Sequence, residues 1–289
     1  MSRSLSSSDS WLNDTRAALT TARSEASAAS RASEPRSSTG TTFSATASGV
    51  TDTPPSVTGL QVGTSGFSYP SWRGGFYPLD SRPADFLRFY ATRFPAVELN
   101  TSSYRLPSEE QFARWAAETP SGFRFAVKMP RSITHGGRLG GIGTFCERVR
   151  ALGDRLGPVL VQLPPERPRD DGFLRLVLGS IDPELLYAFE LPHPSWDGVE
   201  PLLDEAGATR VGALDGAAPF RYLRLREPPY DDKALAAWAA RLQPVLATGI
   251  PVYCFFKHED EPTAPRYALR LLRMAQHNRG DDAPASPSS

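Results

Sequence analysis

A carboxylate and a histidine stand close together in the segment FELPHPSW, residues 189–196. Glu190 ends an otherwise apolar run, and His193 follows between Pro192 and Pro194, whose rings restrict the backbone. Carboxylate and imidazole groups commonly transfer protons in enzymes. Because an unpaired charge is costly inside a buried strand, we expect Glu190 at a strand end, where it can pair or meet water. His193 and Trp196 would then be held beside it.

Polar side chains follow most other apolar runs of the chain in the same way. The candidate catalytic residues are Glu98, Glu190, His193, Asp215 and Lys128, with the two glutamates as acid and base. Candidate substrate-binding residues carry hydrogen-bonding groups, positive charge or a flat ring. They are Trp72, Asn100, Tyr104, Gln162, Trp196, Arg224, Lys257 and His258.

Each candidate also has a structural interpretation, and the sequence leaves both open. Glu98 and Glu190 are alternatively internal partners of Lys128 or Arg224, and we interpret Lys128 as a charge partner before a Schiff-base lysine. His193 is alternatively packed between its prolines, Asp215 belongs to a turn, and His258 lies on a solvated loop. The aromatic residues Trp72, Tyr104 and Trp196 are alternatively packing residues. We interpret His135 and His277 as structural or surface residues.

The elements that would position these residues are eight short apolar runs of strand length, which alternate with helix-like segments. The runs begin at residues 60, 96, 123, 158, 186, 209, 220 and 252. Helical spacing covers 83–94, 108–119, 144–157, 173–181, 200–207, 232–247 and 266–278, and Ser108 with Gln111 reads as a capping box. This alternation predicts a TIM-like (β/α)8 barrel with its functional residues at the carboxyl ends of the strands, which we call the mouth. An open doubly wound sheet is the second possibility.

Two features qualify the barrel. The runs at 209–216 and 220–226 lie too close together for a helix between them, so the barrel should be irregular at its sixth repeat. The glycine-rich segment 136–143 is expected to be a connector or a lid over the mouth.

Composition divides the chain into three parts. Residues 1–58 are rich in Ser, Thr and Ala with few large apolar side chains, so we expect a disordered segment. Residues 59–278 would form the barrel domain, and residues 279–289 a second disordered tail.

Charge and motifs exclude several classes of function. The formal net charge is zero, which argues against a general nucleic-acid surface, although binding of a nucleic-acid end stays open. The chain has neither a membrane-spanning apolar run nor a signal-peptide core, so we expect no membrane partner and a cytoplasmic location. Cys146 and Cys254 are expected to be buried and unpaired. No metal-ligand spacing or cofactor motif is recognisable, so we predict no metal and no cofactor. A metal site formed by Glu98, Glu190, His193, Asp215 and His258 is the less favoured alternative.

Several motifs together resemble the domain of unknown function 72 (YecE-like) family. They are GTSGFSYPSWRGGFYP, VELNTSSYRLPSEEQFARWAAETPSGFRFAVKMPRSITH, LGPVLVQLPP, ELPHPSW and FFKHEDEPTAPRYALRLL, and they span about residues 60–275. The resemblance implies a TIM-like barrel and adds Arg105 to the binding residues, but it supplies no activity. The chain departs from the family pattern at Pro192, where an arginine is usual, and at Arg226-Glu227, where His-Gly is frequent.

Two hypotheses for function follow. The first is an enzyme, of hydrolase or isomerase type, that acts on a small polar or anionic substrate by carboxylate acid–base chemistry at the mouth. The second is a non-catalytic protein that binds an anionic ligand or a nucleic-acid end with the same residues. The sequence makes no prediction of oligomeric state.

Overall fold

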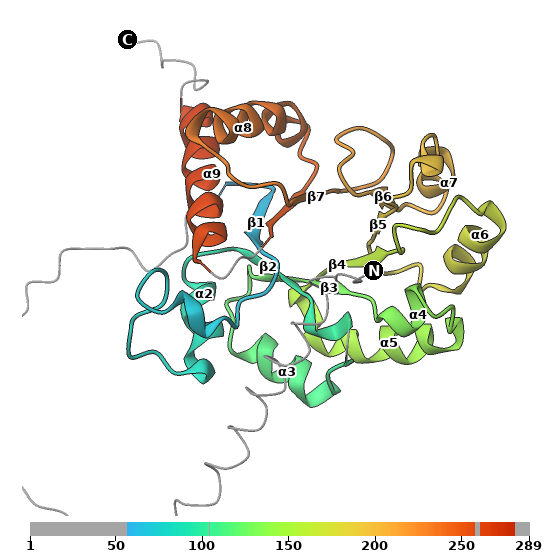
Figure 1. Cartoon of the computed structure of the whole chain (residues 1–289), viewed down its shortest axis with the longest axis horizontal. Coiled ribbons are helices and arrows are strands. Elements are labelled where there is room, and N and C mark those ends of the chain that lie inside the picture. Colours follow the sequence, from blue (N-terminus) through green and yellow to red (C-terminus); the bar gives the residue numbers. More distant parts are fainter. Residues whose placement is uncertain (1–56, 104, 258–260, 281–289) are drawn as a thin grey trace, which may run out of the picture. The chain divides into compact units, whose positions relative to one another are not determined.

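A computed structural model describes residues 57–103, 105–257 and 261–280 (Figure 1). The N-terminal segment predicted to be disordered lies outside the described residues except at positions 57 and 58. The predicted tail lies outside them from residue 281 onward, and so do the candidate site residues Tyr104 and His258.

The described residues contain eight strands, one at each predicted apolar run. Most have four to seven residues, but β6 has only two. The strands are β1 (Leu60–Thr64), β2 (Ala96–Leu99), β3 (Arg124–Lys128), β4 (Leu156–Gln162), β5 (Tyr187–Glu190), β6 (Thr209–Arg210), β7 (Arg221–Leu225) and β8 (Val252–Phe256).

Helices connect most of these strands and lie around them (Figure 1). They are α2 (Phe86–Ala91), α3 (Glu109–Ala117), α4 (Arg131–Thr134), α5 (Ile142–Val149), α6 (Asp171–Ser180), α7 (Glu200–Asp204), α8 (Asp232–Ala247) and α9 (Thr263–Gly280). Short 3-10 helices lie at Pro70–Trp72, Pro83–Asp85, Thr101–Ser103, Leu139–Gly141, Arg150–Arg155 and Pro194–Trp196.

All strand pairs are parallel, which confirms the predicted α/β class. β2 to β6 form one sheet in chain order, and β1, β8 and β7 form another. A bridge between Ser65 and Glu98 links β1 to β2, and the Gly212 N–H donates to the Tyr222 carbonyl at 2.9 Å beside β6 and β7. The strands therefore follow one another as in a TIM-like barrel, although no continuous ladder of hydrogen bonds closes the two sheets into one.

The irregularity predicted at the sixth repeat is present. The structure describes every residue from 211 to 220, and this connection between β6 and β7 contains no helix. Arg221 holds the connection in place, because its guanidinium donates to the carbonyl oxygens of Leu214, Gly216 and Ala218.

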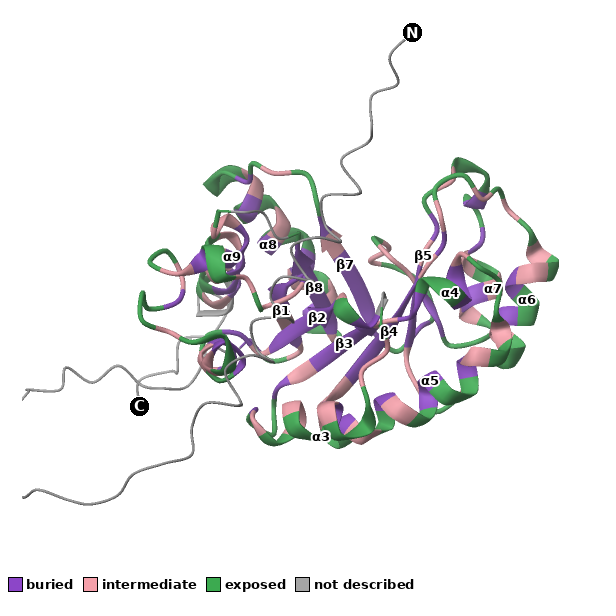
Figure 2. Cartoon of the chain, turned by 60° about the horizontal axis from the view of Figure 1, so that its bottom comes forward, coloured by how far each residue is buried: buried purple, intermediate pink, exposed green. Residues whose placement is uncertain are grey.

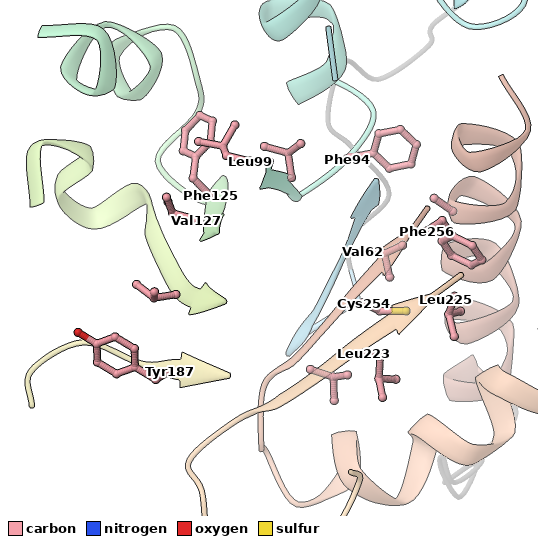
Figure 3. Close-up of a cluster of buried hydrophobic side chains, with 14 of the residues drawn as sticks. Val62, Phe94, Leu99, Phe125, Val127, Tyr187, Leu223, Leu225, Cys254 and Phe256 are labelled. Atoms are coloured by element: carbon pink, nitrogen blue, oxygen red, sulfur yellow. The ribbon is translucent and has the colours of Figure 1, made fainter. Parts of the chain in front are cut away.

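Alternate residues of the strands bury their side chains on the outer face, against the helices. Figure 3 shows part of this layer: Val62 from β1, Val127 from β3, Leu223 from β7 and Cys254 from β8 are among its side chains. Figure 2 shows the consequence, since the strands are buried while the helices expose their outward faces. This layer supplies most of the apolar burial that stabilises the fold.

The intervening residues form a second, smaller cluster between the strands. Ala96, Ala126 and Ala188 leave room for the larger rings of Tyr222 and Tyr253 in this cluster. A barrel interior is filled by such layers of side chains and is not a pore. The next residues on the same strand faces, two positions toward the carboxyl ends, are therefore aimed at the mouth.

Helix boundaries depart from the prediction mainly at one place. The segment 144–157 was predicted to be a single helix, but this is wrong, since α5 ends at Val149 and β4 begins at Leu156. The physical cause is Gly153, whose φ of 57° is incompatible with a right-handed helix. The predicted cap of α3 is confirmed, because Ser108 accepts a hydrogen bond from the Gln111 N–H at 3.3 Å.

Three smaller predictions concern the same described residues. The glycine-rich segment 136–143 connects α4 to α5 and contains the short helix Leu139–Gly141. Both cysteines are buried and unpaired, as predicted. Within the described residues, no helix is both long enough and apolar enough to cross a membrane.

Candidate functional site

Five polar side chains lie two positions beyond the buried inner cluster on their own strands. Since side chains on a strand alternate between its faces, they point inward at the carboxyl ends of β2, β3, β4, β5 and β7. They are Glu98, Lys128, Gln162, Glu190 and Arg224. The structure therefore brings together two predicted acid–base residues, one predicted lysine and two predicted binding residues.

Glu98 is the deepest of these groups, with no exposed surface. Its carboxylate accepts hydrogen bonds from the Ser65 hydroxyl at 2.8 Å, the Tyr222 hydroxyl at 2.8 Å and Arg224 Nη2 at 2.9 Å. Burial alone would raise the pKa of Glu98, but Arg224 and the two hydroxyl donors outweigh burial and lower it below the usual range. Glu98 is therefore a charged anchor for Arg224.

Arg224 joins the two carboxylates of the site. Its Nη1 donates to Glu190 Oε2 at 2.6 Å, while Nη2 is bound to Glu98, and only 6% of its side chain is exposed. Its Nε is buried with no hydrogen-bond partner among the described residues. Charge-assisted bonds to two carboxylates fix a guanidinium in one orientation, so Arg224 is rigidly placed.

Glu190 lies nearer to solvent than Glu98 and has a second cation. Arg226 Nη1 donates to Glu190 Oε1 at 3.0 Å, and 44% of the Arg226 side chain is exposed. Arg226 stands one residue beyond β7, at the position where the chain departs from the family pattern described above. The substituted position therefore keeps a positive charge at the mouth.

Lys128 differs from the two arginines of this site, because no described carboxylate pairs with it. It ends β3 and is half-buried, and among the described residues no carboxylate oxygen lies within 4.0 Å of its Nζ. Burial, followed by repulsion from Arg224, lowers the pKa of Lys128 to about 8, against opposing effects of Glu98 and Glu190. At pH 7 a pKa of about 8 leaves roughly a tenth of this amine uncharged, whereas an ordinary lysine is almost completely protonated.

We call these five charged groups the mouth cluster: Glu98, Lys128, Glu190, Arg224 and Arg226. Three cations stand against two carboxylates, so the described cluster has a net positive charge when all five are ionised. Both carboxylates are engaged by arginines. The charge left for a ligand is therefore positive, and it is carried by the exposed Arg226 and the half-buried Lys128.

Other predicted site residues lie in different surroundings. Trp72 and Trp196 are completely buried, and the Trp196 Nε1–H donates to the Arg167 carbonyl at 3.1 Å. The structure thus gives both tryptophans a packing role in place of the predicted stacking role, because their rings are not accessible to a ligand. Asn100 is half-buried just beyond β2, and Arg105 and Lys257 are exposed.

His193 helps to shape the turn after β5. Its Nδ1 accepts the Ser195 N–H at 3.2 Å and lies 2.8 Å from the Ser195 hydroxyl. This local bond caps the short helix Pro194–Trp196 and directs Nδ1 toward its own turn. The described hydrogen bonds of His193 thus stabilise the turn between Pro192 and Trp196, and none of them joins His193 to the five polar side chains above.

Asp215 lies away from the mouth cluster. The carbonyl groups on either side of it, those of Leu214 and Gly216, are bound by Arg221 at the amino end of β7. Arg224 lies toward the opposite end of the same strand. The prediction that Asp215 assists catalysis is therefore not supported by its position, because the connection from β6 turns back toward the strand start.

Sequence reasoning missed two hydroxyl groups and undervalued one arginine. Tyr222 and Ser65 both donate to Glu98, and Arg226 binds Glu190. Tyr222 was detectable in principle, since it precedes Arg224 by two residues on a strand and must share its face. The pairing of Ser65 with Glu98 depends on the register of β1 against β2, which no local pattern specifies.

A shallow hollow of about 420 Å³ adjoins the carboxyl end of β4. It is lined by His135, Pro164, Glu166, Arg167, Pro168 and Asp170. Burial lowers the pKa of His135, and the charges of Arg131 and Lys128 lower it further.

Within the described residues, no group of three or more His, Cys, Asp and Glu side chains is arranged to hold a metal ion.

Comparison with known proteins places this geometry in a family. A family model described as "Protein of unknown function DUF72" matches residues 61–288. The UPF0759 protein YecE of Escherichia coli (strain K12) is 33% identical over 143 residues, which are 47% of this chain and 50% of that protein. The same name and identity apply to the relative from Escherichia coli O157:H7. The chain thus spans about half the length of the curated relatives it matches.

Two crystal structures of DUF72 family proteins resemble this fold. One, from Enterococcus faecalis V583, has a TM-score of 0.65 at 19% sequence identity, and the match covers 75% of this chain and 95% of the Enterococcus chain. The other, from Thermotoga maritima MSB8, has a TM-score of 0.64 at 24% sequence identity, and the match covers 75% of this chain and 99% of the Thermotoga chain. At these identities the likeness concerns the fold alone.

Proposed function

Since the chain belongs to the family of proteins of unknown function DUF72, whose description assigns no activity, we propose a function from the site itself. The protein is an enzyme that binds a small anionic substrate at the mouth of its barrel and transfers a proton there. Lys128 and Glu190 are the acid–base groups, Arg226 binds the anion, and Arg224 and Glu98 position Glu190. Its location in the cytoplasm stays a prediction from the sequence.

One observation carries this proposal: among the residues that the structure describes, Lys128 lacks a carboxylate within 4.0 Å while both nearby glutamates are bound to arginines. An amine that served only to neutralise Glu98 or Glu190 would be paired with one of them. A pKa of about 8 also allows Lys128 to accept and donate protons near neutral pH, as a general acid–base group must.

The positive excess of the cluster supports an anionic substrate. Arg226 has one carboxylate partner among the described residues and a half-exposed guanidinium, so it keeps donors available for a phosphate or carboxylate. Because its bond to Glu190 already holds it at the mouth, Arg226 would bind such a group without large rearrangement, which favours orientation of the substrate.

A receptor without catalysis is the second candidate, and it has its own observation. Both carboxylates are engaged by cations, which is what a site that only presents arginines to an anion requires. The two candidates differ in one respect: only the enzyme needs Lys128 and Glu190 to exchange protons.

Binding of anions to the full chain tests the shared part of both candidates. Thermal unfolding is measured with sugar phosphates, small dicarboxylates, nucleotides and short oligonucleotides, because a ligand of the folded state raises Tm with its occupancy. We expect a small phosphate or carboxylate compound to raise Tm, and Arg226→Ala to abolish the shift. Arg88→Ala, which removes an exposed arginine of α2, is the matched control and should keep it.

Turnover of the compound that binds separates the enzyme from the receptor. In the enzyme, Glu190→Gln and Lys128→Met abolish turnover. Binding without turnover in the unaltered protein contradicts the enzyme and leaves the receptor. A shift with oligonucleotides alone contradicts the small anionic substrate.

A further inference from the structure

Lys128 is singled out among the primary amines of the chain. The sequence contains three lysines, and the other two, Lys233 at the start of α8 and Lys257 beyond β8, are exposed. Lys128 alone among them ends a strand on its inner face, where its neighbours are the buried side chains below and the mouth cluster beside it. This is an unusual place for a lysine that has no ion-pair partner within the described part of the chain.

The arrangement around Lys128 keeps the amine available for reaction. Glu98 and Glu190 face it from β2 and β5, but Arg224 and Arg226 bind their oxygens. Arg224 and Arg226 also repel a positive charge on Lys128, and His135 faces it from the end of α4. Both described glutamates near the amine are thus bound by arginines, although their negative charge still partly opposes the lowering of the Lys128 pKa.

We propose that Lys128 is a nucleophile that forms an imine with the carbonyl group of a small ketone or aldehyde bearing a phosphate or carboxylate. The inference rests on the proposed function, since the anionic group of this compound occupies the same mouth. It goes further by naming the reacting atom and the class of substrate.

The chemistry balances without an oxidant, reductant or cofactor. The uncharged amine of Lys128 adds to the carbonyl carbon, which forms a C–N bond and a carbinolamine. The nitrogen then loses its proton, the hydroxyl group takes up a proton and leaves as water, and a C=N bond remains. Glu190, which is partly exposed to the mouth, is placed to relay that proton between nitrogen and oxygen.

Burial and charge favour the first step. A nucleophilic lysine must be unprotonated, and desolvation with nearby cations is the arrangement that lowers a lysine pKa for this purpose. The pKa of about 8 for Lys128 agrees with the geometry. The imine nitrogen would then take up one proton from water and become cationic close to Glu190, where its charge is stabilised.

Reductive trapping tests the proposal on the full chain. The protein is incubated with dihydroxyacetone phosphate or pyruvate, reduced with borohydride, and analysed by intact mass and by mapping of proteolytic peptides. We expect one adduct per chain, located on Lys128, and none in Lys128→Met or Lys128→Arg. Lys233→Met, which removes an exposed lysine, should react as the unaltered protein does, and uncharged acetone should give at least tenfold less adduct.

The outcomes separate this inference from the function on which it rests. Adducts spread over Lys233 and Lys257, or no adduct with either ketone, overturn the imine. If the same ketones or other small anions still raise Tm in a manner that Arg226→Ala abolishes, the proposed anion site stands and only the nucleophile fails. Absence of both adduct and Tm shift refutes both. Peptide mapping of the unaltered protein decides the matter even where a Lys128 variant does not fold.

Discussion

Arg224 determines what the other side chains of the site can do. It binds Glu98 on one side and Glu190 on the other, with Nη–Oε distances of 2.9 and 2.6 Å. An isolated buried charge is unfavourable by several kcal/mol, so each of these ion-paired side chains depends on its partner. Among the described residues, Lys128 is left outside this series of ion pairs, and that is why we propose its amine, and not a carboxylate, as the reacting group.

Glu98→Gln should show this dependence in the stability of the protein. Removing the charge leaves Arg224 with one carboxylate in a buried position, and we expect the free energy of unfolding to fall by about 3 kcal/mol. Chemical denaturation measures the change. Glu147→Gln, an exposed position on α5, is the control and should change stability by less than about 0.5 kcal/mol.

The same comparison has a defined pH dependence. The pKa of Glu98 is lower in the folded protein than in the unfolded chain, so its stabilising contribution is complete above the unfolded value of about 4.3. The contribution is lost as pH falls through the lower folded value. The difference between the unaltered protein and Glu98→Gln should therefore shrink below about pH 4. A difference that is constant down to pH 2 would show that Glu98 is not a charged partner of Arg224.

For individual residues, the sequence predicts which side chains lie at the same end of the barrel better than it predicts which of them form ion pairs. Alternation along the strands was enough to place Glu98, Lys128, Gln162, Glu190 and Arg224 at one end of the barrel. It could not show that Arg224 binds both glutamates, because that depends on side-chain conformations across separate strands. The tryptophans were misplaced because their proximity to strand ends does not indicate whether their rings are covered.

The backbone of β1 lies very close to the backbone of β2 at Gly63. A methyl group at Gly63 would overlap the carbonyl oxygen of Ala96 and lie 2.8 Å from the Tyr90 hydroxyl oxygen. Backbone cannot yield here without separating the strands that carry Ser65 and Glu98. Glycine is therefore required at position 63 for close approach of the chains.

Gly63→Ala should consequently destabilise the protein by about 3 kcal/mol or more, through overpacking that disturbs the β1–β2 contact. Gly143→Ala is the matched substitution, since a methyl group there meets no atom within 4 Å and lies in α5. It should raise stability by about 0.5–1 kcal/mol through its higher helix propensity. Thermal or chemical unfolding of the two variants measures both changes in stability. Equal changes in the two variants would contradict the close approach at Gly63.

Element boundaries followed the sequence where local chemistry specifies them. The cap at Ser108 and the missing helix between 211 and 220 were both predictable, from a side-chain acceptor and from a connection that is too short. The end of α5 was not, because apolar spacing continues through Gly153 while its backbone turns to positive φ. The length of β6 depends on pairing with β5, a property of the assembled sheet.

The barrel consists of two sheets that adjoin at two places, between β1 and β2 and between β6 and β7, which we call the seams. The two seams differ in their hydrogen bonds. At the β1–β2 seam the Gly66 N–H donates to the Glu98 carbonyl at 2.8 Å, and the Ser65 hydroxyl donates to the Glu98 side chain. At the β6–β7 seam the described residues contribute one backbone hydrogen bond, from Gly212 to Tyr222, beside a strand of two residues. The second seam is therefore the weaker one.

Hydrogen exchange should reveal this difference. The amide of Gly212 is expected to exchange at least tenfold faster than the amides of β4, which is paired on both sides. Mass spectrometry or NMR of the native protein measures the rates. Equal protection of Gly212 and β4 would mean that the two sheets open as one unit.

Among the described residues of the mouth, the Lys128 amine has no carboxylate within 4.0 Å, while arginines bind both neighbouring carboxylates. The most direct test is competitive acetylation of the native full chain across pH 6–11, with each of the three lysines followed by mass spectrometry. Lys128 is expected to titrate with a midpoint of about 8. A midpoint near the ordinary lysine value of about 10.4, or higher, would mean that Lys128 is ion-paired and does not exchange protons near neutral pH.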